Sequence, residues 1–139
     1  MLKKMSIKNF TVFPGAELIF SNGLNVIIGE NGSGKSHILK TAYSVMTASA
    51  EEGRNPKAGD PTKALLQKKY ADKLINVLRP DTLGRLARRK QGRERCELGF
   101  EFLETKLNTG FGFATSSKTD VQIDQLPQIW QKTVSVFIA

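Results

Sequence analysis

Apolar and polar residues alternate at the start of the chain, as they do in a β-strand with one buried face. "KMSIKNFTVF" predicts a first strand, and Pro14-Gly15 predicts the turn that ends it. "AELIF" predicts a second strand and "SNG" the next turn, in a hairpin-like arrangement. The following run, "LNVIIG", is apolar throughout, which predicts a strand buried on both faces.

Helical spacing replaces the alternation after this run. A helix is predicted from about Lys35 to Ala48, because apolar residues recur there at intervals of three and four: Ile38, Leu39, Ala42, Val45 and Met46. The next ten residues, "EEGRNPKAGD", lack any periodicity and predict a surface loop.

A second helix is predicted between two proline-containing pairs. Asp60-Pro61 supplies a cap followed by a favourable first helical residue, and Arg79-Pro80 marks the end. Its apolar face is formed by Leu66, Tyr70, Leu74 and Val77. The stretch after it, "DTLGRLARRKQGRER", predicts at most a short helical turn and a basic loop.

Alternation returns in the last third of the chain. "CELGFEFLE", "NTGFGFAT" and "TDVQID" predict an antiparallel meander with one buried face. "PQIWQ" interrupts the pattern, and "VSVFIA" predicts a further core strand. We therefore expect one unit over residues 1–139, in four parts. Residues 1–50 hold the strand hairpin, a glycine-rich loop and the first helix; 51–95 a loop, the second helix and the basic segment; 96–125 the meander; and 126–139 a turn and a core strand.

The glycine-rich loop carries the strongest chemical signal. "GENGSGKS", residues 29–36, matches G-x-x-x-x-G-K-[ST] between a predicted buried strand and a predicted helix, which is the context that a P-loop requires. Gly29, Gly32 and Gly34 allow a tight turn whose N–H groups point at a phosphate chain, and the helix amino end adds positive potential. Lys35 can reach the β- and γ-phosphates of ATP, while the Ser36 hydroxyl can ligate Mg²⁺.

The residues around the motif resemble a known family. "MSIKNFTVF…ELIFSNGLNVIIGENGSGKSHILKTAY" resembles the amino-terminal lobe of ABC-type ATPase heads of the RecF, SMC and OLD-like branch of AAA-family ATPases. The resemblance is specific over about residues 5–43 and architectural beyond. It implies an α/β P-loop fold, incomplete here, with a mixed sheet core and a flanking antiparallel β-subdomain. It also implies a role in DNA repair, chromosome maintenance or phage defence, and that the chain covers roughly the first third of a head.

The resemblance also assigns roles to single residues. Asn31 and Gly32 are expected against the phosphates, with the Ser33 backbone at the β-phosphate. His37 departs from the common Ser or Thr at its position. It either contacts the α-phosphate or is a solvated first-turn histidine. Phe13 is expected in the core rather than beside the adenine.

The parts of such heads that hydrolyse ATP have no match in the sequence. There is no LSGGQ-like signature and no apolar strand ending in Asp-Glu. "VQID" is too short and polar to be that strand, so Asp124 is expected in a turn. In this family a second head covers the γ-phosphate, so the remainder of the head or a second copy is an expected partner. We therefore expect this chain to bind Mg-ATP and to turn it over near the background rate.

The net charge of +8 comes from one segment. Residues 57–95 carry twelve Lys and Arg against four acids, whereas the rest of the chain carries nine of each. Within this basic segment, residues 85–96, "RLARRKQGRERC", either contact DNA phosphates or form a solvated loop whose charge serves solubility. The candidate DNA contacts are Arg85, Arg88, Arg89, Lys90, Arg93 and Arg95.

Composition narrows the setting without identifying a function. The longest apolar run is too short to cross a bilayer, and no secretory signal follows the first lysines. The single cysteine, Cys96, is expected to be a partly buried structural thiol in a reducing, cytoplasmic setting. Two other functions stay open: a P-loop kinase of a small substrate, for which no acceptor-binding carboxylate is apparent, and a non-catalytic regulatory module that retains the loop.

Overall fold

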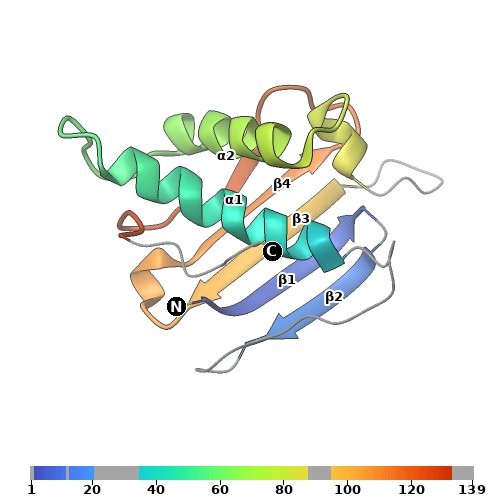
Figure 1. The fold of residues 1–139 in the computed structure, drawn as a ribbon, viewed down its shortest axis with the longest axis horizontal. Coiled ribbons are helices and arrows are strands. Elements are labelled where there is room, and N and C mark those ends of the chain that lie inside the picture. The colour runs from blue at the N-terminus through green and yellow to red at the C-terminus, as the bar shows by residue number, and fades with distance from the viewer. Residues whose placement is uncertain (1, 12, 21–34, 88–94, 133–139) are drawn as a thin grey trace.

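The computed structural model describes residues 2–11, 13–20, 35–87 and 95–132 (Figure 1). Within these ranges five strands and two long helices form two layers. The elements are, in chain order, β1 (Leu2–Phe10), β2 (Phe13–Ile19), α1 (Lys35–Gly53), α2 (Lys63–Leu78), the 3-10 helix η1 (Leu83–Leu86), β3 (Arg95–Phe102), the 3-10 helix η2 (Thr105–Leu107), β4 (Thr109–Ala114) and β5 (Gln122–Gln125).

The described strands form one antiparallel sheet in the order β2-β1-β3-β4-β5. The predicted meander of β3, β4 and β5 is confirmed, and β1 pairs with β3, so the meander and the first hairpin belong to the same sheet. The two strands predicted for a mixed core sheet, "LNVIIG" and "VSVFIA", lie outside the described residues.

The first turn differs from its prediction. β1 ends at Phe10, which pairs with Phe13, so Pro14 and Gly15 lie inside β2 rather than in the turn. The reversal is made at Thr11, whose φ is 50° and whose N–H donates to the carbonyl of Leu86 at 2.7 Å. A proline is compatible with β2 because β2 is an edge strand of the described sheet and needs fewer N–H donors.

Both helices differ from their predictions at one end. α1 runs to Gly53, five residues past the predicted end, and Glu51 and Glu52 in its last turn form ion pairs with Lys73 and Lys69 of α2. α2 begins after Thr62, whose Oγ1 accepts a hydrogen bond from the Leu65 N–H at 3.3 Å; the cap predicted at Asp60 was wrong.

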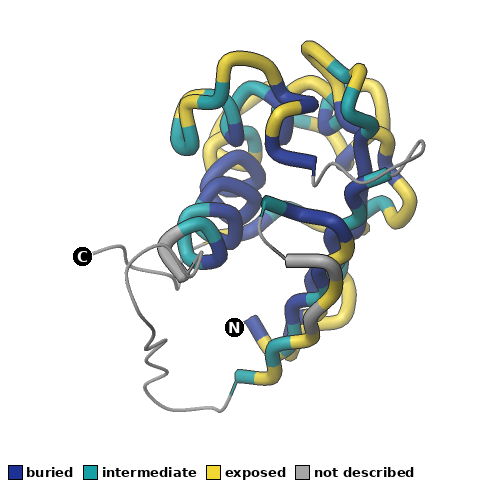
Figure 2. The backbone as a smooth tube through the Cα atoms, turned by 90° about the vertical axis from the view of Figure 1, so that its right-hand side faces the viewer, coloured by how far each residue is buried: buried dark blue, intermediate teal, exposed yellow. Residues whose placement is uncertain are grey.

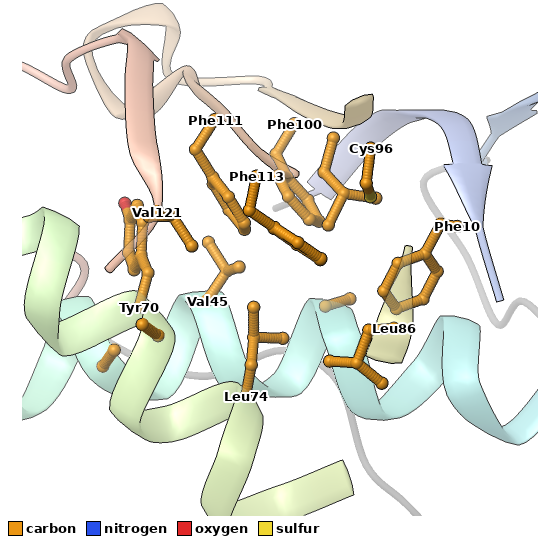
Figure 3. Packing of buried hydrophobic residues seen from close by; sticks show 14 of the residues in the cluster. Phe10, Val45, Tyr70, Leu74, Leu86, Cys96, Phe100, Phe111, Phe113 and Val121 are labelled. Carbon is orange, nitrogen blue, oxygen red and sulfur yellow. The ribbon is translucent and has the colours of Figure 1, made fainter. Parts of the chain in front are cut away.

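The core lies between the sheet and the two helices, which cover the same face (Figures 1 and 3). Along β3 buried and less buried residues alternate, and its four buried side chains join this core. Aromatic rings fill the centre: the centroids of Tyr70 and Phe111 are 5.0 Å apart, and those of Phe100 and Phe111 6.1 Å. Other large, fully buried side chains are Met5, Phe10, Val45, Met46, Leu66, Leu74, Leu83, Phe102 and Phe113.

Candidate functional site

The predicted P-loop ends at the first residues of α1. Gly29, Asn31, Gly32, Ser33 and Gly34 lie outside the described residues. The described helix α1 runs from Lys35 over 19 residues, so the last two positions of the motif lie in a helix, as the motif requires. The first turn of α1 holds no acidic residue, so no side chain there offsets the positive potential of the helix amino end.

His37 lies in this first turn and is half-buried, which differs from a fully solvated histidine. Its Nδ1 is buried and has no hydrogen-bond partner among the described residues. Burial lowers the pKa of His37 below its usual 6.5, and the charge of Lys40 lowers it further. The ring is therefore mainly neutral at pH 7, and its Nδ1 has no hydrogen-bond partner in the part of the chain that the structure describes.

The middle of α1 is buried on every side. Seven consecutive residues, 44–50, are buried, which is almost two full turns (Figure 2). The hydroxyls of Thr41 and Ser44 donate to the carbonyls of His37 and Lys40, at 2.5 and 2.6 Å, so they are satisfied within the helix. α1 is thus a central helix whose amino end carries the candidate site.

The predicted basic segment is partly neutralised by its own neighbours. Lys69 and Lys73 pair with the acids of α1. Arg95 donates to Glu97 Oε1 at 3.2 Å and to Asp124 Oδ1 at 3.1 Å. The candidate contacts Arg88, Arg89, Lys90 and Arg93 lie outside the described residues.

The contacts of Arg95 change two expectations from the sequence, one for Asp124 and one for Arg95 itself. Asp124 is in strand β5 and pairs with Arg95, so the turn expected for it was wrong. Arg95 reaches Asp124 across β4 at Gly112, where an added Cβ would lie 2.6 Å from the guanidinium carbon. Because its charge is already compensated by two carboxylates, Arg95 is a poor candidate for a DNA contact.

The chain that leads into the basic loop is firmly held. Gly84 of η1 packs so closely on Thr115 that an added Cβ would lie 2.0 Å from the Thr115 carbonyl oxygen, and its N–H donates to the carbonyl of Ser117. Ala87 forms a β-bridge with Phe10. Arg85, between these contacts, is exposed. In Figure 1, η1 and the amino end of α1 both lie on the right-hand side of the molecule.

The face of the sheet that the helices leave open bears a shallow groove that the sequence interpretation did not include. It has a volume of about 650 Å³, and its floor contains Ser6, Gly99 and Gly110, which are consecutive cross-strand partners. The charged residues that line it are Lys8, Glu17, Arg95, Glu97 and Asp124, and each forms an ion pair. The groove therefore offers no unbalanced charge to an anion. In the sequence, this groove is indicated by glycines at positions of "ELGFEF" and "NTGFGF" where the alternating pattern places polar residues.

The remaining candidate chemistry is sparse within the described ranges. Cys96 is buried, as expected, and burial raises the pKa of its thiol. The residues that the structure describes contain no group of three or more His, Cys, Asp or Glu side chains suited to a metal ion. No helix in those residues combines the length and the apolar character that a membrane crossing needs.

Comparison with known proteins points to one family. The family AAA_15, described as AAA ATPase domain, matches residues 1–128. The DNA replication and repair protein RecF of Streptococcus gordonii is 34% identical over 56 residues, which are 40% of this chain and 16% of that protein. RecF of Cytophaga hutchinsonii is 45% identical over 42 residues, or 30% of this chain and 11% of RecF.

A second kind of relative matches over a similarly short region. The DNA double-strand break repair Rad50 ATPase of Archaeoglobus fulgidus is 45% identical over 40 residues, which are 29% of this chain and 4% of that protein. The chain therefore matches less than a fifth of the length of each of these relatives.

Proposed function

The chain belongs to the AAA ATPase domain family, and from this premise we propose that it binds ATP together with Mg²⁺ at the amino end of α1. In this proposal the N–H groups of residues 29–34 surround the phosphates, with Asn31, Gly32 and the Ser33 backbone nearest to them. Lys35 neutralises the β- and γ-phosphates, and the Ser36 hydroxyl ligates Mg²⁺. His37 donates a hydrogen bond from its neutral ring to the α-phosphate.

One observation carries this proposal: Lys35 and Ser36, the last two positions of the motif, lie in the helix α1, as a P-loop requires. Two further features support it. The first turn of α1 has no acidic residue that repels a phosphate. The buried Nδ1 of His37 has no partner among the described residues, so a hydrogen bond to it would satisfy a polar atom that otherwise has none there.

Calorimetric titration with Mg-ATP tests the site. We expect Lys35→Ala to weaken binding by at least about tenfold, because it removes a charge-assisted contact of about 1.5–3 kcal/mol. Lys40→Ala is the matched control: it removes the same charge from α1 little more than one turn further on, and we expect affinity within about twofold of the wild type. Equal losses in both variants indicate a general charge effect, and a flat wild-type titration refutes the site.

We also propose that the protein that contains this chain acts on DNA, in repair, maintenance or phage defence. The relatives named above are a DNA replication and repair protein and a DNA double-strand break repair ATPase. In this proposal Arg85, Arg88, Arg89, Lys90 and Arg93 contact DNA phosphates, and the remainder of the head or a second copy completes the nucleotide site. Turnover by this chain alone is expected near background.

A salt series with labelled DNA tests the contacts proposed for residues 85–93. Arg88→Glu with Arg89→Glu should weaken binding strongly and reduce the slope of log K against log salt by about one for each phosphate that the variant no longer neutralises. The control is Lys63→Glu with Lys68→Glu, which makes the same charge change at exposed positions of α2. Equal effects from the two pairs assign the binding to net charge alone.

A further inference from the structure

Residues 126–132, which we call the strap, connect the far end of the sheet to the helices. The strap follows β5 and first contacts η2, where the Gln128 N–H donates to the carbonyl of Lys106 at 2.8 Å. In Figure 1 the strap is the orange-red loop on the left, beside the last turns of α1. It therefore lies at the end of α1 opposite to the proposed nucleotide site.

At this end the strap is fixed to α1 by two consecutive residues. The Gln131 N–H donates to Ser49 Oγ at 2.9 Å, and this bond is buried. Trp130 lies directly over Gly53, since a Cβ added to Gly53 would be 2.6 Å from Trp130 Cβ. The Trp130 indole N–H donates to the carbonyl of Gly59 at 2.8 Å, which also ties the strap to the loop between α1 and α2.

The carboxyl end is where α1 is held by directional contacts. Hydroxyl and carboxylate bonds from α1 to other described elements are made by Ser49, Glu51 and Glu52, all within its last five residues. The hydroxyls of Thr41 and Ser44 bond within the helix instead. The buried surface between is apolar and includes Ala42, Val45 and Ala48, whose contacts are packing contacts.

α1 is a continuous helix of 19 residues and spans about 28 Å. A shift imposed at its amino end is therefore transmitted along the helix, because changing its length requires breaking backbone hydrogen bonds. We propose that the strap and nucleotide binding are energetically coupled through α1, so that ATP at the amino end alters the position of residues 126–132. This inference rests on the proposed ATP site, and it adds a conformational output to that site.

A matched pair of glycine substitutions isolates the contact. Gly53→Ala places a Cβ against Trp130 and displaces the strap, whereas an alanine at Gly59 has no heavy atom within 4 Å of its Cβ and keeps the carbonyl that accepts from Trp130. Both substitutions are equally conservative in sequence. Trp130→Ala is a further variant, which removes the strap anchor without adding volume to the helix end.

The test is the Mg-ATP dissociation constant of the full chain, measured where thermal melts show each variant to be folded. Coupling predicts that Gly53→Ala and Trp130→Ala change the ATP dissociation constant about fivefold or more, both in the same direction because both displace the strap, while Gly59→Ala stays within about twofold of the wild type. Trp130, the single tryptophan of the sequence, provides a second readout: its fluorescence changes on ATP addition to the wild type.

Hydrogen exchange separates coupling from general stabilisation by a ligand. ATP should alter exchange at the Gln128 and Gln131 amides by a larger factor than at amides of β4, which report the whole fold. Wild-type binding with unchanged strap exchange, or unchanged affinity in Gly53→Ala, overturns the coupling and leaves the ATP site intact. Absence of binding to the wild type refutes the ATP site and the coupling together.

Discussion

α1 and α2 pack on the same face of one sheet, yet they are stabilised in opposite ways. α2 buries four residues along one stripe, Leu66, Tyr70, Ala71 and Leu74, and leaves its other side to water. α1 is buried at seven consecutive positions and has mostly small side chains there. The large side chains of α2 therefore stabilise the fold by filling the core. The small side chains of α1 instead allow neighbouring elements to pack closely against that helix.

This difference follows from the two sequences. In α2 the apolar residues are large and spaced by three or four, as in an amphipathic surface helix. In α1 the run "SVMTASA" is buried at every position, which is possible because alanine, serine and threonine suit contact on any side. A helix of this kind packs against its neighbours on all sides over residues 44–50.

The largest effect that tests this comparison is expected from truncating α2. Leu74 is fully buried, so Leu74→Ala should lower the free energy of unfolding by about 2–5 kcal/mol through reduced transfer energy and a residual cavity. Urea denaturation measures the change. Lys68→Ala, at an exposed position of the same helix, should stay within about 0.5 kcal/mol. A decrease below about 1 kcal/mol for Leu74→Ala means that the core does not depend on α2 for volume.

Enlarging α1 tests the other half of the comparison. Ala48 is 3% exposed and belongs to the core cluster, so Ala48→Leu adds volume that the packed surroundings cannot accept without strain. We expect the free energy of unfolding to fall by about 1–3 kcal/mol. The same change at the exposed Ala64 of α2 is the control, with no decrease expected. If the Ala48 variant is as stable as the wild type, α1 has free space beside it and is not tightly enclosed.

The sequence predicted the parts of the fold whose signals are local. Alternation in "CELGFEFLE" and the spacing of Leu66, Tyr70 and Leu74 identified the meander and α2 because each pattern reflects one buried face. The β1–β2 turn was misplaced because the carbonyl that receives the Thr11 N–H comes from Leu86, far along the chain. A short stretch of sequence around Pro14 does not include Leu86 and therefore cannot predict this hydrogen bond.

The same division applies to the candidate site. The P-loop motif is contiguous, so a prediction of its position needs only the local sequence; its last two residues, Lys35 and Ser36, lie in α1, and residues 29–34 lie outside the described residues. The pairing of Arg95 with Asp124 joins strands β3 and β5 and depends on the gap left by Gly112 between them. Such a contact depends on the order of the strands in the sheet, and the alternation of apolar and polar residues within a strand does not specify that order. Hence the neutralisation of the basic segment could only be found from the structure.

A smaller effect is expected at the start of α2. Thr62 Oγ1 caps the Leu65 N–H at 3.3 Å, and Thr62→Ala should cost about 1 kcal/mol because that donor is left to water. Thr62→Asn, which retains a capping oxygen, should restore most of the stability. Thermal unfolding followed by circular dichroism measures both. Asp60→Ala should have little effect, and a larger decrease there than at Thr62 contradicts the assignment of the cap.

The smallest effect at neutral pH is expected from Tyr70→Phe on α2. The Tyr70 hydroxyl forms a hydrogen bond with Thr109 Oγ1 at 3.1 Å, and Thr109 Oγ1 also donates to the Gln125 carbonyl. The variant therefore leaves Thr109 with a partner and should lose only about 0.5–1 kcal/mol of stability.

Burial raises the pKa of Tyr70 to about 12, above its usual value of 10.0. The unfolded state therefore loses this proton first, and the wild type should lose stability relative to the variant as the pH rises from about 10 to about 12. Denaturation of both proteins across that range, with Tyr43→Phe as the control, measures the difference. A constant gap between wild type and Tyr70→Phe over this range means that the hydroxyl is accessible to water, and that α2 does not seal this part of the core.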